Sequence, residues 1–174
     1  IVTSGKRVRA RKEWAVIFRA VRGINELGLK ACVSPGIIDR EQAEALKAAG
    51  LYRYHHNLET SRSFFGKICT THDYDEDVEA VRAARSAGLS TCCGGIIGLG
   101  EGVGHRIELA LTLRDLGVDS VPLNILNPIK GTPLGRTPPP PPLEILTTIA
   151  IFRFLLPDRD IKLCGGKEKN LRQL

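Results

Sequence analysis

The sequence predicts an α/β fold, namely a partial (β/α) barrel of the TIM type with about five βα units of a longer barrel. The main observation is a helix-like stretch, a glycine and a short apolar strand in succession, which recurs at Gly28, Gly50, Gly88 and Gly117. A glycine just past a helix end closes the helix in the left-handed conformation, and a strand directly after it is typical of a βαβ unit. With no long linker between the units, a barrel is favoured over an open doubly wound sheet.

The helices are predicted from the spacing of their apolar side chains. Trp14, Ile17 and Val21 share one face of a helix that ends before the first glycine. Asp39 is a helix cap with Gln42 three residues later, as in a capping box. Further helices are expected around 78–84 and 107–111, with a last one over 143–156 that a proline stops. The expected strands are 29–33, 51–55, 90–93, 120–123 and 160–164.

Length favours a single domain, residues 1–174. The chain opens at Ile1 on what reads as the tail of a strand and contains no methionine, so we expect it to be an internal piece of a longer protein. Pro138 to Pro142 form a stiff proline run, which we expect to be a surface connection.

Charge and cysteine usage exclude several classes of protein. The net charge is +6, but no aromatic residues interleave with the basic run that starts at Lys6, so we expect no nucleic-acid partner. The longest apolar stretch, 145–156, is interrupted by Arg153 and is too short to span a bilayer. Five irregularly spaced cysteines do not suggest a disulfide framework, which favours a reducing, cytoplasmic location.

Thiols follow several of the predicted strands. Cys32 and Cys92 each end a strand, and ligands bind at the carboxyl ends of parallel strands. A lone cysteine is more often a core residue, but two at equivalent strand ends predict metal–sulfur chemistry as readily as packing. Lys162 and Cys164 lie two residues apart on the last strand, so both should face the same side. Cys93 has the opposite parity to Cys92 and should point into the strand–helix layer, and Cys69 is expected to be packing.

Polar residues follow the neighbouring strands. His55, Asn57 and Glu59 alternate, so in an extended segment they share one side, where a carboxylate suits a ribose diol. The alternative is an Asx-turn with a helix cap at Thr60. Asn124 again presents a polar group after a strand. The glycine-rich run 94–101 is expected to be a turn that lets a ligand approach the backbone, although it matches a dinucleotide fingerprint only loosely.

The motifs at 54–61, 70–72, 92–101 and 123–134 are together similar to those of the biotin synthase family of radical S-adenosylmethionine enzymes, and the similarity covers nearly the whole chain. That family inserts sulfur into dethiobiotin on a (β/α) barrel, with S-adenosylmethionine, a [4Fe-4S] cluster and an auxiliary cluster, [2Fe-2S] or a variant. The resemblance also implies an electron donor such as flavodoxin or ferredoxin, and a homodimer.

The resemblance implies roles residue by residue. Cys32 and Cys92 match auxiliary-cluster ligands, and a third such cysteine would fall immediately before Ile1. His55 and Asn124 match positions that face dethiobiotin. The S-adenosylmethionine site is implied at Asn57, Glu59, Gly94, Ile96, Gly98 and Glu101.

The chain departs from the family pattern at three places. The CxxxCxxC loop for the radical-generating cluster is absent, so its ligands are expected outside these residues and the chain alone should be inactive; no catalytic residue is assigned. Lys162 replaces an arginine that completes the auxiliary cluster, and either it or Cys164 is the expected fourth ligand. Asp77 replaces an arginine near the S-adenosylmethionine carboxylate, and His55 replaces an asparagine.

Two other readings remain open from the sequence. A related radical enzyme, of the hydrogenase-maturation or methylornithine-forming type, would share the barrel. Those relatives would not need auxiliary-cluster thiols at both Cys32 and Cys92, so this pair favours sulfur insertion. An inactive barrel remnant is the third possibility.

Overall fold

A computed structural model describes residues 1–171 of the chain. The chain separates into two compact units. The first unit contains 1–57 and 75–93, and the second contains 58–74 and the described residues from 94 onward. The prediction of one domain over 1–174 stays a prediction.

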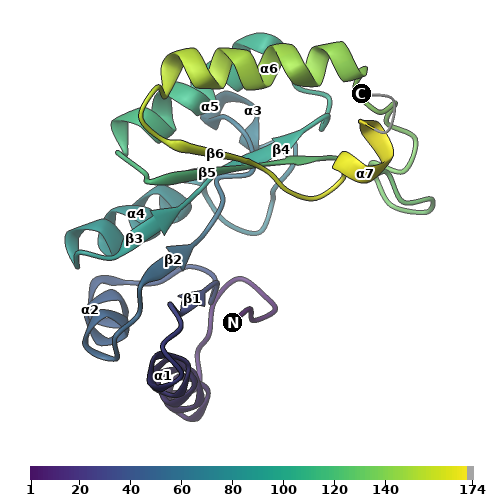
Figure 1. The fold of residues 1–174 in the computed structure, drawn as a ribbon. Coiled ribbons are helices and arrows are strands. Elements are labelled where there is room, and N and C mark those ends of the chain that lie inside the picture. Colours follow the sequence, from purple (N-terminus) through teal and green to yellow (C-terminus); the bar gives the residue numbers. More distant parts are fainter. Residues whose placement is uncertain (172–174) are drawn as a thin grey trace. The chain divides into compact units, whose positions relative to one another are not determined.

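The first unit has three short parallel strands, β1 (Cys32–Val33), β2 (Arg53–His55) and β3 (Ser90–Cys92), with β2 in the middle. Its helices are α1 (Arg11–Glu26), α2 (Arg40–Ala48) and α4 (Tyr74–Ser86) (Figure 1). Val2 extends the sheet beside β1 through a parallel bridge to Ser34. The expectation that the chain opens on the tail of a strand is therefore consistent with the structure.

Local sequence signals account for the helices of the first unit. Trp14, Ile17 and Val21 are buried along one side of α1, as their spacing predicted. The Asp39 side chain accepts a hydrogen bond from the main-chain N–H of Gln42, and the Gln42 side-chain oxygen accepts one from the main-chain N–H of Asp39, so the predicted capping box is confirmed. The glycines that follow the helices, Gly28, Gly50, Gly88 and Gly117, all have positive φ angles, as predicted for helix-closing residues.

The second unit has parallel strands β4 (Gly95–Ile97), β5 (Ser120–Ile125) and β6 (Asp160–Leu163), with β5 in the middle. Its helices are α3 (Arg62–Phe65), α5 (Val103–Asp115), α6 (Pro142–Leu155) and α7 (Lys167–Asn170). In Figure 1, α6 runs beside α5 and along β6, and these elements pack on one another.

The structure differs from the sequence analysis at the glycine-rich run, after position 60 and in the lengths of two strands. The run 94–101 was expected to be a turn, but Gly95–Ile97 forms β4, because the main chain of Ile96 pairs with that of Glu59 and the strand joins β5. The short helix α3 was expected only in the alternative with a helix cap at Thr60, and it begins at Arg62 with Ser61 at the N-cap position. The predicted strands exist, but β1 and β2 are shorter than their apolar runs.

None of the helices within residues 1–171 combines the length and the continuous apolar character that crossing a bilayer requires.

Candidate functional site in the two units

One face of the first unit's sheet carries the predicted thiols. In the ladder, Cys32 lies opposite Arg53, which lies opposite Ser90, and one pleat further His55 lies opposite Cys92. Partners in a parallel ladder point to the same face, and so do residues two apart on a strand. We call this the open face, because its side chains are exposed or half-buried, whereas Val33, Tyr54 and Thr91 between them are buried. The open face consists of Cys32, Arg53, His55, Ser90 and Cys92.

Cys32 and Cys92 share this face but lie on its two outer strands. By standard strand spacings their Cα atoms are about 10 Å apart across the strands and about 7 Å along them. Thiolates bound to a single ion lie closer, since each metal–sulfur bond is only about 2.3 Å long. Within residues 1–171, no three His, Cys, Asp or Glu side chains converge as a ready-made site for one ion. The pair therefore fits a multinuclear cluster better than a single metal ion.

Cys93 lies on the opposite side of the sheet and is fully buried, as its parity predicted. Cys69 differs from its prediction as packing: it is half-buried, and its Sγ lies 3.3 Å from Nδ1 of His72, in the second unit. Accessible sulfur in the first unit thus comes only from the two cysteines of the open face, among the residues described.

His55 is the neighbour of Cys92 across the ladder. Burial, and secondarily the nearby His56, lower the pKa of His55 below its ordinary value of 6.5. The imidazole is therefore neutral at pH 7 and presents a lone pair on the open face. Asn57 follows two residues later and is half-buried.

Glu59, in the second unit, has a strained backbone. Its φ is 62°, and it is the one residue other than glycine with a positive φ among those described. Thr60 donates its N–H to the carbonyl of Leu58 at 2.7 Å, so Glu59 is the centre of a classic γ-turn, which is rare in proteins. The Glu59 carbonyl in turn accepts from the N–H of Ile96 at 2.8 Å. The extended alternation expected for 55–59 therefore ends before Glu59, and strain of this kind clusters at binding sites.

The glycine-rich run owes two of its glycines to internal packing. A Cβ on Gly94 would lie 1.9 Å from the carbonyl oxygen of Pro122. Gly98 has a φ of 95°, and a Cβ there would lie 2.8 Å from Pro140. Glycine is therefore needed at these two positions because other segments of the chain pack closely against them. Within the run, the side chain of Ile96 on β4 is half-buried.

Glu101 lies behind the run rather than on its surface. Its Oε1 accepts from the N–H of Gly98 at 2.9 Å and from Nε of Arg106 at 2.7 Å. Arg106 is itself buried and reaches α6, where it donates to Thr148 and pairs with Glu144 at 2.7 Å. The carboxylate therefore stabilises the conformation of the glycine-rich run. It would support a ligand bound to the run through the backbone rather than by direct contact.

A second set of predicted residues shares one face of the second unit's sheet. Ile96 lies opposite Asn124, and Pro122 lies opposite Lys162. Lys162 is exposed, and Cys164 follows it half-buried, with its N–H donating to the carbonyl of Leu123 at 2.9 Å. The Asn124 side-chain oxygen accepts from the N–H of Gly165 at 3.0 Å, which orients the amide at the carboxyl end of β5.

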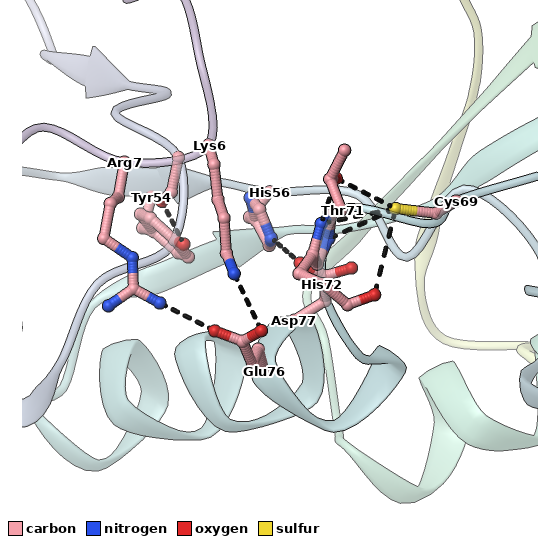
Figure 2. Close-up of polar contacts among 10 residues, drawn as sticks. Lys6, Arg7, Tyr54, His56, Cys69, Thr71, His72, Glu76 and Asp77 are labelled. Atoms are coloured by element: carbon pink, nitrogen blue, oxygen red, sulfur yellow. Dashed lines mark hydrogen bonds and ion pairs between the residues drawn. The ribbon is translucent and has the colours of Figure 1, made fainter. Parts of the chain in front are cut away.

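Sequence reasoning missed two buried charged residues, Asp77 and Arg106, that contact predicted or neighbouring residues of the site. Asp77 was noted only for departing from the family pattern, yet it lies 2.7 Å from Nε2 of His56 (Figure 2). Arg106 was not singled out either. The pairs His56–Asp77 and Glu101–Arg106 do not have the spacing of neighbours on one helix face or one strand, so periodicity could not predict them. The one available signal was the unusual residue at position 77.

Residues 1–113 match the radical SAM superfamily, which is more than half of the chain. The chain therefore belongs to the radical SAM superfamily, a class of enzymes named for radical chemistry with S-adenosylmethionine. Residues 122–174 match the biotin and thiamin synthesis associated domain. The parallel sheet with helices agrees with this class and with the predicted fold.

Curated relatives indicate which radical SAM enzymes the chain is similar to in sequence. The chain is 58% identical over 175 aligned residues to biotin synthase of Geotalea uraniireducens, covering 100% of the chain and 53% of that protein. Biotin synthase of Geobacter sulfurreducens is 58% identical with the same coverage. The chain thus spans about half the length of the curated relatives that it matches.

Solved structures with the same fold are more distant in sequence. Methylornithine synthase superposes with a TM-score of 0.77 at 24% identity, over 86% of this chain and 45% of that one. A maturase of the [FeFe]-hydrogenase superposes with a TM-score of 0.73 at 18% identity, over 86% of this chain and 37% of that one. At these identities the similarity shows the fold alone.

Proposed function

We propose that this chain takes part in biotin synthesis as part of a radical S-adenosylmethionine sulfurtransferase that converts dethiobiotin to biotin. The observation that carries the proposal is the placement of Cys32 and Cys92 on one accessible face of a parallel sheet, with His55 between them. The relatives at 58% identity support this reaction over the methylornithine-forming and hydrogenase-maturation alternatives, whose structures share only the fold.

The open face would hold the auxiliary iron–sulfur cluster. Thiolates suit iron, and the span between Cys32 and Cys92 suits a cluster with bridging sulfide. Val2 pairs in parallel with Ser34, so in a longer protein a residue directly before Ile1 would lie beside Cys32. That is where the family resemblance expects a third cysteine.

S-adenosylmethionine would be held by the residues that the family resemblance implies. Asn57 and Glu59 would hold its ribose and methionine parts, and the run containing Gly94, Ile96 and Gly98 would receive the adenine, with Glu101 maintaining the shape of the run. When bound and reduced by an electron donor of the flavodoxin or ferredoxin class, the cofactor pair of S-adenosylmethionine and a [4Fe-4S] cluster supplies a 5′-deoxyadenosyl radical. The ligands of that cluster would come from outside these residues.

This chain's own residues would bind and orient dethiobiotin. His55 and Asn124 would face it, and the side-chain amide of Asn124 is oriented because its oxygen accepts a hydrogen bond from the N–H of Gly165. A neutral imidazole at His55 can donate or accept a hydrogen bond without bringing charge to the pocket.

The fourth ligand of the auxiliary cluster would be Cys164 or Lys162. A thiolate suits iron better than an ammonium, which supports Cys164. We expect the intact Cys164→Ser variant to lose auxiliary iron and sulfide, with Lys162→Ala as the matched comparison. Unchanged metal content and spectrum in Cys164→Ser would assign the position to Lys162.

Anaerobic reconstitution of the intact protein tests the function. Incubation with S-adenosylmethionine, a reductant and dethiobiotin should yield biotin and 5′-deoxyadenosine. Formation of 5′-deoxyadenosine without biotin would indicate a related radical enzyme with another substrate, and neither product would indicate an inactive barrel remnant. The mass of the purified protein in solution tests the proposed homodimer.

A further inference from the structure

A buried carboxylate holds the histidine that precedes Asn57. Oδ1 of Asp77 lies 2.7 Å from Nε2 of His56, and the side chains are 3% and 15% exposed. Both residues belong to the first unit, with His56 directly after β2 and Asp77 in the first turns of α4. Figure 2 shows the imidazole directed at the carboxylate from across the strand–helix layer.

The chemistry of the pair defines the state of the imidazole. An ionised carboxylate can only accept hydrogen bonds, so Nε2 of His56 carries a proton and donates it. The amino end of a helix favours a negative charge, which suits Asp77 to its place in α4. The ring of His56 also stacks on that of Tyr54, with centroids 5.9 Å apart. Its orientation is therefore restricted from two sides.

The main chain of His56 is held as well. Its N–H donates to the carbonyl of Cys92 at 3.1 Å. Residue 56 is thus attached to β3 through its backbone and to α4 through its side chain. Asn57 is the next residue, so the direction in which it leaves the sheet depends on both attachments.

We propose that Asp77 is a positioning residue, which acts through His56 to hold Asn57 in the geometry that binds S-adenosylmethionine. The proposal rests on the proposed function, because it takes Asn57 as a ligand-binding residue. The family resemblance places an arginine at position 77, in contact with the ligand's carboxylate. Asp77 carries the opposite charge, is buried and is engaged by His56, so its contribution to binding is made through the protein.

A double-mutant cycle in the intact, cluster-loaded protein tests this mechanism. S-adenosylmethionine affinity is measured by calorimetry for Asp77→Ala, Asp77→Asn, His56→Ala and the Asp77→Ala/His56→Ala double variant. We expect Asp77→Ala to weaken binding about tenfold, the usual lower size of such supporting-residue effects. Asp77→Asn keeps an acceptor for Nε2 and should stay within about threefold of the wild type. Glu79→Gln, an exposed change on the same helix, is the matched control.

The double variant separates a positioning role from a direct one. If Asp77 acts through His56, the double variant binds no more weakly than either single variant, because both remove the same attachment. Additive losses, or an Asp77→Asn variant as weak as Asp77→Ala, would show direct contact with the ligand and overturn the proposal. If Asp77→Ala does not fold, His56→Ala compared with His56→Gln tests the same attachment.

Hydrogen exchange of the His56 amide gives a readout that needs no ligand. Loss of the side-chain attachment should speed exchange of this amide in Asp77→Ala but not in Glu79→Gln. Unchanged exchange would overturn the proposal. If the wild type fails to bind S-adenosylmethionine although Asp77→Ala still speeds exchange of the His56 amide, the proposed function is overturned while the attachment of His56 to Asp77 stands.

Discussion

The carboxylate of Glu101 and the guanidinium of Arg106 form a buried ion pair, with 2.7 Å between Oε1 and Nε and exposed fractions of 2% and 5%. The same carboxylate oxygen closes the glycine-rich run through the N–H of Gly98, and Arg106 continues to Glu144 and Thr148 on α6. Two helices and the proposed adenine-binding run therefore share one buried polar network. Such networks rigidify a structure when they are satisfied and are costly when one member is lost.

The first prediction concerns this network. Arg106→Ala should lower the free energy of unfolding by about 3–5 kcal/mol, because it leaves the Glu101 carboxylate buried without its cation. Chemical denaturation measures the change. Arg114→Ala, at an exposed position on the same helix, should stay within about 0.5 kcal/mol. A loss below about 1 kcal/mol for Arg106→Ala would mean that water replaces the guanidinium.

A second prediction compares two glycines. Gly94→Ala should destabilise the protein by about 1–3 kcal/mol or more, since the added Cβ meets the Pro122 carbonyl and the chain must shift. Gly104→Ala has open space in α5 and should stabilise by about 0.4–1 kcal/mol, because alanine restricts the unfolded chain. Melting temperatures of the two variants should therefore move in opposite directions, and a shared direction would contradict the local geometry.

The third prediction separates the cysteines by face. Cys32→Ala and Cys92→Ala should each abolish the auxiliary-cluster iron, whereas Cys93→Ala should leave it unchanged, because Cys93 is buried on the other side of the sheet. Iron and sulfide analysis after anaerobic reconstitution, with the visible spectrum, measures this. Equal iron in all three variants would remove the open face as the cluster site.

The fourth prediction is a dependence of stability on pH in the metal-free protein. The folded-state pKa of His55 is lowered from 6.5, chiefly by burial, so below pH 6.5 the unfolded chain binds more protons than the folded one. The contribution of His55 is complete above pH 6.5 and is lost as the pH falls through its folded-state pKa. His55→Asn should flatten this acidic loss, as measured by urea midpoints between about pH 7 and pH 5. A slope identical to that of the wild type would show that His55 does not contribute.

Much of the scaffold was predictable from local signals. The closing glycines, the capping box of Asp39 and Gln42 and the apolar face of α1 each depend on residues within a few positions of one another. The opposite sides taken by Cys92 and Cys93 follow from the two-residue period of a strand. These features were predicted correctly because neighbouring residues alone decide them.

Where local signals compete, the prediction was wrong. Glycines at 94, 95 and 98 indicated a turn, yet pairing with Glu59 and with β5 makes a strand of Gly95–Ile97. Cys69 follows two phenylalanines and was expected to pack, but its sulfur lies among polar groups next to His72. Long-range pairing overrides composition in the first case, whereas the polar contacts of Cys69 are made with residues two and three positions away.

The sequence by itself determined the α/β class, the order of the helices and strands apart from α3 and β4, and the family resemblance, because periodicity and short motifs are properties of neighbouring residues. Only the tertiary structure decided that His56 belongs with Asp77, that Glu101 belongs with Arg106 and that Glu59 adopts a left-handed turn. Those contacts join residues on different elements or depend on a distant strand. Their energies come from burial and hydrogen-bond geometry, which exist only once the chain has folded.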